Sequence, residues 1–353
     1  DIDLQRPVVH SVTIRNETLD HTDQYAKDGD LLAVTATITD ADPTFGRHAV
    51  RGIGPSLYGA YMMYSTPDSY VGDQAVWAAR PAALTPTDGP APFLAEARDP
   101  SGNFSVLRAD TIMADNPPPA PVSGLAATAG HNLVTLTWDT PAASDANYRQ
   151  TAVRREPWQG YPFYDDPAPA YPAGPDSGQA AYLGTDSTTT LTFAADGSER
   201  DILALAAFHV DLAGNVSPAA ASARALTTTY RLGDVRGAPV GSPGDGVVDL
   251  YDITRLGDAF GRLRADPDFD GECDLGPADD GASGIPAPDG EIGLDDLAIF
   301  ADRYDLDQGT TAAAAQAAAA AAGQSPRPTA TPHLVWRHAA PGVWSLVLAT
   351  PCP

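Results

Sequence analysis

Apolar and polar residues alternate with a period of two along several short stretches in the first two thirds of the chain. One such stretch runs from Gly29 to Asp40 and has turn-forming residues at both ends. Its apolar face consists of Leu32, Val34, Ala36 and Ile38. Because side chains alternate between the two faces of a sheet, this pattern predicts a half-buried β-strand.

The alternation returns beyond residues 115–119, where Asp, Asn and three prolines indicate a stiff domain boundary. The apolar positions of this second region are Val134, Leu136, Trp138, Leu191 and Phe193. Residues 202–210 predict a further strand, followed by a turn at 211–215. We therefore expect two β domains, in residues 1–116 and 117–229.

A helical period replaces the alternation in two later stretches, 250–260 and 294–304. The first places Leu250, Ile253, Leu256 and Phe260 on one face, and the second places Leu294, Leu297, Phe300 and Tyr304 on one face. Both patterns predict short amphipathic helices with these residues turned toward a core. They indicate a small α module in residues 230–308.

The charge of the chain is strongly negative and unevenly placed. Its 353 residues include 46 acidic and 21 basic residues, for a formal net charge of −25. This balance argues against nucleic acid and anionic membranes as partners, because both need clustered basic residues. Residues 232–307 alone hold 19 acids and 5 arginines, a net charge of −14, so the acidity is concentrated where the two helices are predicted.

Each predicted helix begins within a segment of the form Asp-Gly-x-[Val/Ile]-x-Leu-x-Asp. An EF-hand-type calcium loop takes ligands from positions 1, 3, 5, 7, 9 and 12, with glycine at position 6. Counted back from Asp252, Asp245 is fifth, Val247 is seventh through its carbonyl and Asp249 is ninth. Counted back from Asp296, Asp289 is fifth, Glu291 is seventh through its carbonyl, and Gly293 is ninth, where water would substitute.

Both loops are lengthened after their second position, so the third ligand cannot be assigned. Asp279 or Asp280 could supply it in the second loop. The apolar eighth residues, Val248 and Ile292, could pair the two loops by a short β contact. Without metal the clustered carboxylates would repel one another, so we expect a poorly ordered segment. The alternative is a set of acidic turns that bind no metal.

These patterns resemble known families of extracellular modules. Residues 1–116 resemble the immunoglobulin-like modules of bacterial surface proteins. Residues 117–229 resemble a fibronectin type III module, with Trp138 early and the sequence Asp-x-x-Gly-Asn-x-Ser-Pro late. Residues 230–308, with two loop–helix repeats, resemble a dockerin. The fold class is therefore expected to be mainly β: two tandem β-sandwiches, a dockerin-like module and a C-terminal helix and hairpin.

The dockerin resemblance implies two Ca²⁺ ions. The implied ligands are Asp234, Asp245, Val247, Asp249 and Asp252 in the first loop, and Asp274, Asp289, Glu291 and Asp296 in the second. At positions 10 and 11, where partner-reading dockerins often carry small hydroxyl residues, this chain has Leu250-Tyr251 and Leu294-Asp295. That departure weakens the expectation of a cohesin-type partner.

An aromatic and proline-rich insertion interrupts the second β domain at residues 157–175. It holds Trp158, Tyr161, Phe163, Tyr164 and Tyr171. Exposed aromatic rings on a stiff loop could form a contact surface or a platform for carbohydrate. The alternative is a long loop that packs over its own sandwich.

Further calcium between the two β domains is an open alternative. The candidate ligands are Asp1, Asp3, Asp40, Asp42, Asp99 and Asp115. Asn16, Asn103 and Asn215 stand in glycosylation sequons. Turn chemistry explains Asn103 and Asn215 equally well. The two cysteines, Cys273 and Cys352, could form one long-range disulfide, but they are too few for a disulfide scaffold.

The C-terminal region is expected to form a short helix and a hairpin. Residues 312–322 are almost all alanine, which favours a helix, and lie within a helix-and-linker segment, 309–332. The alternative is that the alanine-rich stretch is only a spacer. Two apolar runs within residues 333–353 predict a β-hairpin. Because a lone hairpin is unstable in water, it must dock on its own chain, on a following domain or on a neighbouring subunit.

No catalytic constellation is present in the sequence, so we expect no enzyme. The favoured hypothesis is a secreted, calcium-stabilised structural or adhesive protein, a repeating subunit of a cell-surface fibre or layer that assembles through its terminal strands. The alternative is a dockerin-bearing anchoring protein that recognises a cohesin-type or carbohydrate partner. A third class is a non-catalytic part of a larger secreted hydrolase.

Overall fold

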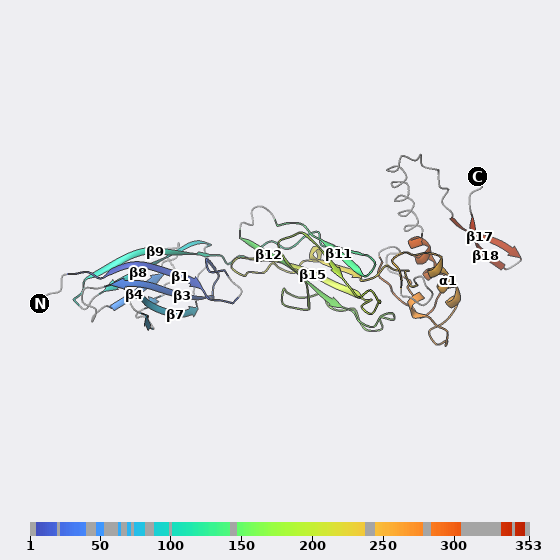
Figure 1. Ribbon diagram of the computed structural model, residues 1–353, viewed down its shortest axis with the longest axis horizontal. Helices are drawn as coiled ribbons and strands as arrows, with labels where there is room; N and C mark the ends of the chain where they lie inside the picture. Colours follow the sequence, from blue (N-terminus) through green and yellow to red (C-terminus); the bar gives the residue numbers. More distant parts are fainter. Residues whose placement is uncertain are drawn as a thin grey trace, which may run out of the picture.

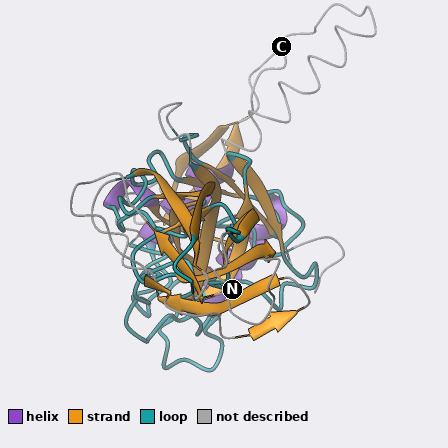
Figure 2. Cartoon of the chain, turned by 90° about the vertical axis from the view of Figure 1, so that its left-hand side faces the viewer, coloured by secondary structure: helices purple, strands orange, loops and turns teal. Residues whose placement is uncertain are grey.

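The computed structural model describes most of the chain outside its loop inserts and tail. The described residues are 5–19, 22–39, 47–52, 63–64, 69–71, 74–81, 88–98, 101–141, 147–236, 244–277, 284–304, 333–340 and 343–349. Two β-sandwich units follow one another along the long axis, and helix α1 (Leu250–Ala259) comes after them (Figure 1). Figure 2 views the chain from its N-terminal end, with strands in front and helices behind. None of the described helices is long and apolar enough to cross a membrane.

Two facing sheets make up the first unit, which we call the first sandwich. One sheet has the order β1-β3-β7-β6 and the other β2-β9-β8-β4-β5. The strands are β1 Val8–Asn16, β2 Tyr25–Ala26, β3 Leu31–Thr39, β4 Arg47–Gly52, β5 Met63–Tyr64, β6 Ser69–Val71, β7 Gln74–Pro81, β8 Gly89–Arg98 and β9 Phe104–Ala114. The expected strand at residues 29–40 is confirmed as β3, whose four apolar residues are all buried.

A three-stranded and a four-stranded sheet make up the second sandwich, with the orders β10-β11-β14 and β13-β12-β15-β16. The strands are β10 Ala126–Ala129, β11 Leu133–Thr137, β12 Tyr148–Pro157, β13 Gln179–Gly184, β14 Thr188–Thr192, β15 Ile202–Asp211 and β16 Arg224–Thr228. Val134, Leu136 and Trp138 are buried in its core, as the alternation predicts. The predicted turn after β15 also forms: Gly214 N–H donates to the Asp211 carbonyl and Asn215 N–H to the Asp211 carboxylate.

The acidic segment folds into a small unit with two helices, which we call the loop module. Helix α1 spans Leu250–Ala259, and residues 294–304 form the second helix. A core of buried side chains joins them, including Val248, Leu256, Ile292 and Phe300. Of the short 3₁₀ helices, η1 (Ala221–Ala223) comes just before β16 of the second sandwich, and η2 (Gly271–Cys273) comes just before the second loop.

The predicted apolar faces of the two helices are only partly correct. Leu250 is 52% exposed and Leu294 is 69% exposed, while Phe260 ends α1 and is also exposed. Leu256 and Phe300 are fully buried as expected. The buried stripe is narrower than the periodicity suggests, because these helices are short and each packs on one side only.

The C-terminal hairpin is confirmed at the level of the backbone. Strands β17 (His333–Ala340) and β18 (Val343–Ala349) pair antiparallel, and no third described strand joins their sheet. The alanine-rich stretch 312–322 lies outside the described residues.

Candidate metal centre

Asp252 organises loop one, which we define as residues 234–252. It lies in the first turn of α1, where it forms a capping box with Asp249. Its Oδ1 accepts hydrogen bonds from the N–H groups of Val235 (2.8 Å) and Arg236 (2.9 Å), and its Oδ2 accepts one from Asp249 N–H (2.8 Å). One fully buried carboxylate therefore closes the loop by binding both of its ends.

Asp296 repeats this arrangement in loop two, residues 274–296. Its Oδ1 accepts from Leu275 N–H (2.6 Å) and Gly276 N–H (2.8 Å), and its Oδ2 accepts from Gly293 N–H (2.7 Å). The donors stand at the same loop positions as those of Asp252. The two loops thus share a hydrogen-bonding framework as well as a sequence pattern.

The aspartates that open the loops are also buried and equivalent. Asp234 accepts from Gly246 N–H at 2.9 Å, and Asp274 accepts from the N–H groups of Asp289 (3.1 Å) and Gly290 (2.9 Å). Gly246 and Gly290 have φ values of +93° and +87°, in the left-handed region that favours glycine. The conformation at the sixth position is therefore the one that a tight metal-type loop requires.

The fifth-position aspartates differ from these four because their side chains reach solvent. Asp245 accepts from Val247 N–H, and Asp289 accepts from Glu291 N–H. Asp249 caps α1 by accepting from Tyr251 N–H at 2.7 Å. Asp279 and Asp280, the candidate third ligands, lie outside the described residues.

Burial makes the ionised form of the inner aspartates unfavourable. It raises the pKa of Asp252 to about 6 and that of Asp274 to about 6, although backbone N–H donors lower both. Burial also raises the pKa of Asp234 and of Asp296. The negative charge of Asp234 adds to the rise at Asp252, and that of Asp296 adds to the rise at Asp274. The first and last aspartates of each loop therefore repel each other, and a bound cation would relieve that repulsion.

The donor chemistry fits a hard cation, although the side chains are not gathered into a shell. Oδ1 of Asp234 is buried and has no hydrogen-bond partner among the described residues, which is an uncommon state for a carboxylate oxygen. Yet within the described part of the chain no group of three or more His, Cys, Asp or Glu side chains is arranged to hold a metal.

The prediction of a β contact between Val248 and Ile292 is wrong, because the backbone of Ile292 pairs with a different segment. Its N–H donates to the Arg262 carbonyl at 3.0 Å, and its carbonyl accepts from Gly261 N–H at 2.8 Å. Loop two therefore pairs with the chain that follows α1, while both apolar side chains meet in the common core.

Loop one rests directly on the second sandwich. His131 Nδ1 lies 3.3 Å from Asp234 Oδ2, and Arg200 Nη2 lies 3.8 Å from the same oxygen. A Cβ on Gly246 would approach the His131 Cβ to 2.8 Å, so the close approach requires glycine. The sequence carried no signal for His131 or Arg200, because both lie more than thirty residues before the loop.

The aromatic insertion at 157–175 packs on its own sandwich, as the alternative expectation has it, and also reaches the loop module. On its own sandwich, the Arg224 guanidinium of β16 lies 5.2 Å from the centroid of the Tyr171 ring, and Trp158 N–H donates to the Ile202 carbonyl of β15 at 2.8 Å. Phe163 stacks on Phe269 with ring centroids 6.3 Å apart. The Arg264 guanidinium lies 4.2 Å from the centroid of the Phe163 ring and makes two hydrogen bonds with Asp165, of 2.5 and 2.6 Å. Tyr164, which an open carbohydrate platform would expose, is buried. The insertion therefore joins the two units.

The junction between the two sandwiches is polar and contains the only lysine of the sequence. Lys27 Nζ donates to the Gly214 carbonyl at 2.7 Å. Asp115 accepts from Asn147 at 2.9 Å, and Thr22 N–H donates to the Leu212 carbonyl. Of the candidate ligands for calcium between the sandwiches, Asp1, Asp3, Asp40, Asp42 and Asp99 lie outside the described residues.

Two of the three sequon asparagines have buried amides. Asn16 Nδ2 donates to the Tyr25 carbonyl and to Asp30, and Asn215 Nδ2 donates to the Asp115 carbonyl and to Asp211. An oligosaccharide on either nitrogen would break these bonds, so turn and junction chemistry accounts for both asparagines.

Cys273 is fully buried in the core of the loop module and forms no disulfide with any described residue. Burial raises its pKa, which makes the thiolate scarce. Cys352 lies outside the described residues, so the disulfide between them stays a prediction.

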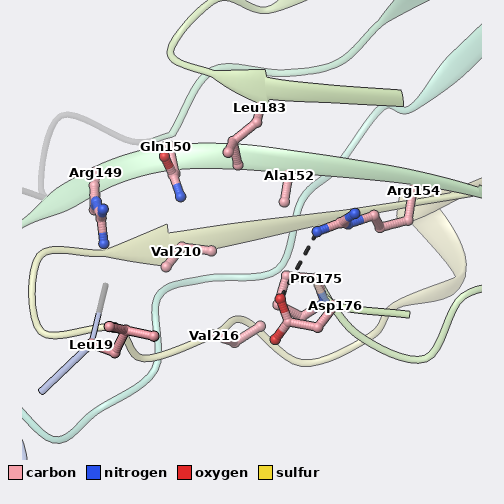
Figure 3. Close-up of a pocket in the computed structure, with 11 residues that line it drawn as sticks. Leu19, Arg149, Gln150, Ala152, Arg154, Pro175, Asp176, Leu183, Val210 and Val216 are labelled. Atoms are coloured by element: carbon pink, nitrogen blue, oxygen red, sulfur yellow. Dashed lines mark ion pairs between the residues drawn. The ribbon is translucent and has the colours of Figure 1, made fainter. Parts of the chain in front are cut away.

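A separate open pocket of about 440 Å³ lies on the outer face of the second sandwich. Arg149, Gln150 and Arg154 line it from β12, and Leu183 lines it from β13 (Figure 3). Arg154 pairs with Asp176 of the loop before β13 at 3.9 Å. The pocket thus mixes basic and apolar side chains and is distinct from the acidic loops.

The strand orders define the class of protein. The chain is a mainly β protein with fibronectin type III-like sandwich architecture and two short helices. No protein-family model matches the chain, and no curated protein matches it.

Two solved structures similar to the chain contain fibronectin modules. The fibronectin(III)-like modules of Clostridium thermocellum CbhA align at 10% identity over 62% of this chain and 94% of theirs, with a TM-score of 0.33. The FN1-FN3 domains of chicken CNTN1 align at 12% identity over 62% of this chain and 69% of theirs, with a TM-score of 0.34.

Proposed function

We propose that this chain is a calcium-stabilised extracellular structural protein, a repeating subunit of a cell-surface fibre or layer. In this proposal the first sandwich is immunoglobulin-like and the loop module is dockerin-like. The observation that carries the proposal is the repeated framework of buried aspartates, two in each loop, with backbone donors at equivalent positions.

Calcium would be held by the carboxylates and carbonyls that the two loops share. In loop one these are Asp234, Asp245, Asp249, Asp252 and the Val247 carbonyl; in loop two they are Asp274, Asp289, Asp296 and the Glu291 carbonyl. The ion would supply positive charge to carboxylates whose burial otherwise disfavours ionisation. Because loop one contacts His131 and Arg200 of the second sandwich, calcium bound in that loop would also stiffen the link between the units.

Assembly would use the C-terminal hairpin. Its two strands form a sheet of their own among the described elements, and such a sheet is marginal in water. Adding these strands to an open sheet edge of a neighbouring copy would satisfy their outer backbone groups and extend the chain of units.

The test is a calcium titration combined with electron microscopy. Asp245→Ala and Asp289→Ala should each lower the calorimetric stoichiometry from about two ions to about one, because each removes an exposed ligand and leaves the buried framework intact. Filaments or sheets should be present in calcium and absent in chelator. The exposed Asp258→Ala on α1 is the matched control and should keep both ions.

Two results would contradict the proposal. An unchanged calcium stoichiometry in both variants would contradict the assignment of the two loops as calcium sites. A monodisperse monomer in millimolar calcium would contradict the assembly of the chain into a fibre or layer.

The second candidate function is an anchor for a cohesin-type partner. It is favoured by the exposure of Leu250 and Leu294, which occupy matching positions of the two repeats, and of Tyr251. Exposed apolar residues at repeated positions suit a protein–protein contact.

Binding to an immobilised cohesin domain tests this second function. Capture of the native chain, reduced at least tenfold in a Leu250→Asp, Leu294→Asp double variant, would support the anchor. Absence of capture in the presence of calcium would exclude that cohesin as a partner and leave the structural function.

A further inference from the structure

Arg200 places a positive charge beside the first aspartate of loop one. Its side chain is only 3% exposed, that of Asp234 is fully buried, and Nη2 lies 3.8 Å from Asp234 Oδ2. A Cβ on Gly244 would come within 2.4 Å of the same Nη2 and 2.1 Å of Asp234 Oδ1. The guanidinium is therefore packed against the mouth of the loop.

The aromatic insertion and the first residue of the loop module hold the guanidinium in place. Nη1 lies 3.4 Å from the Tyr161 hydroxyl, and the guanidinium carbon lies 5.3 Å from the centroid of the Tyr230 ring. Such packing leaves Arg200 few alternative positions. Its charge is thus a permanent part of the surroundings of Asp234.

Loop two differs from loop one in its neighbouring cations. Asp274 makes no ion pair among the described residues, and its contacts there are the N–H groups of Asp289 and Gly290. Arg264 interacts electrostatically with Asp274, but its guanidinium is held by two hydrogen bonds to Asp165 and forms no ion pair with Asp274 among the described residues. The two loops therefore share their framework of buried aspartates. They differ at the ninth position, which is Asp249 in loop one and Gly293 in loop two, and in the cation that the second sandwich places beside Asp234.

We propose that Arg200 acts as a built-in counter-cation of loop one. It neutralises Asp234 in the metal-free protein, which keeps loop one and its contact with the second sandwich ordered, and it lowers the calcium affinity of that loop relative to loop two. This inference rests on the proposed calcium function. It also replaces the expectation that the whole metal-free segment is poorly ordered.

The reason is simple electrostatics at short range. A monovalent guanidinium and a divalent ion that share one buried carboxylate repel each other, and the protein interior screens that repulsion weakly. Removing the guanidinium should therefore strengthen calcium binding. When calcium is absent, it should leave the buried negative charge of Asp234 without the positive charge of Arg200. Substitution of Arg200 should therefore raise the calcium affinity of loop one and lower the stability of the metal-free protein.

Calorimetric titration of the full chain with calcium chloride tests this inference. The native chain should show two classes of site, the weaker lost in Asp245→Ala and the tighter lost in Asp289→Ala. Arg200→Met should strengthen the weaker class by about tenfold or more and leave the tighter class unchanged. In chelator the same variant should melt at a lower temperature than the native chain. The rise in its melting temperature on adding calcium should be larger than the rise in the native chain.

Three further variants keep the result interpretable. Arg200→Gln removes the charge but retains an amide donor for Tyr161. It should strengthen the weaker class as Arg200→Met does, and it replaces that variant if Arg200→Met folds poorly. Arg200→Lys keeps the charge and should retain the weak class. Arg224→Met removes the arginine that lies over the Tyr171 ring, 5.2 Å from its centroid, and should change neither class.

The possible failures are distinct. Two sites of equal affinity in the native chain, or a weak class unchanged in both Arg200→Met and Arg200→Gln, would overturn the role of Arg200 and leave the calcium function standing. Absence of any calcium binding would overturn both.

Discussion

Replacing Asp252 with alanine should strongly destabilise the loop module. The change leaves the N–H groups of Val235, Arg236 and Asp249 without their acceptor in a buried site and removes the capping box of α1. Each unsatisfied buried donor costs on the order of 1–3 kcal/mol, so we expect a loss of at least about 3 kcal/mol in the free energy of unfolding. Asp296→Ala should act in the same way on loop two, and each variant should bind about one calcium ion fewer.

Urea unfolding followed by circular dichroism, with and without calcium, measures this effect. Asp252→Asn is the informative comparison, because it keeps one carbonyl oxygen for two of the three donors and should lose less stability. Asp258→Ala, an exposed aspartate on the same helix, should stay within about 0.5 kcal/mol of the native chain. A native-like free energy of unfolding in both alanine variants would show that the two networks do not hold the module together.

Tyr230→Ala should release the loop module from the second sandwich. The buried Tyr230 ring lies 5.3 Å from that of Tyr161 and packs beneath the Arg200 guanidinium, and its hydroxyl lies 3.3 Å from that of Tyr164. Loss of a buried aromatic ring costs about 3–5 kcal/mol. We expect proteolysis between the two units to become fast and small-angle scattering to report a wider range of particle dimensions.

Tyr230→Phe is the matched variant. It keeps the ring contacts and removes only the hydroxyl contact with Tyr164, so the expected loss is about 1 kcal/mol. Equal proteolysis rates in Tyr230→Ala and the native chain would contradict the view that this tyrosine cluster joins the units.

The local predictions succeeded where the pattern of the sequence is itself the physical cause. The alternation that places Leu32 and Val34 on one face of β3 determines which face is buried, because side chains alternate in any strand. Glycine at the sixth loop position and aspartate in the first turn of α1 are similarly local requirements. The apolar faces of the helices were predicted less well, since Leu250 and Leu294 are exposed only because nothing else in the described chain packs on them.

The amino-acid sequence by itself determined the strands, the two short helices, the repeated loops and the concentration of acid within them. The tertiary structure alone decided what surrounds the loops. It turned the aromatic insertion toward the loop module and set Arg200 and His131 beside Asp234. Such contacts join residues far apart in the chain, and no periodicity or spacing records them, because they depend on how complete units pack against each other.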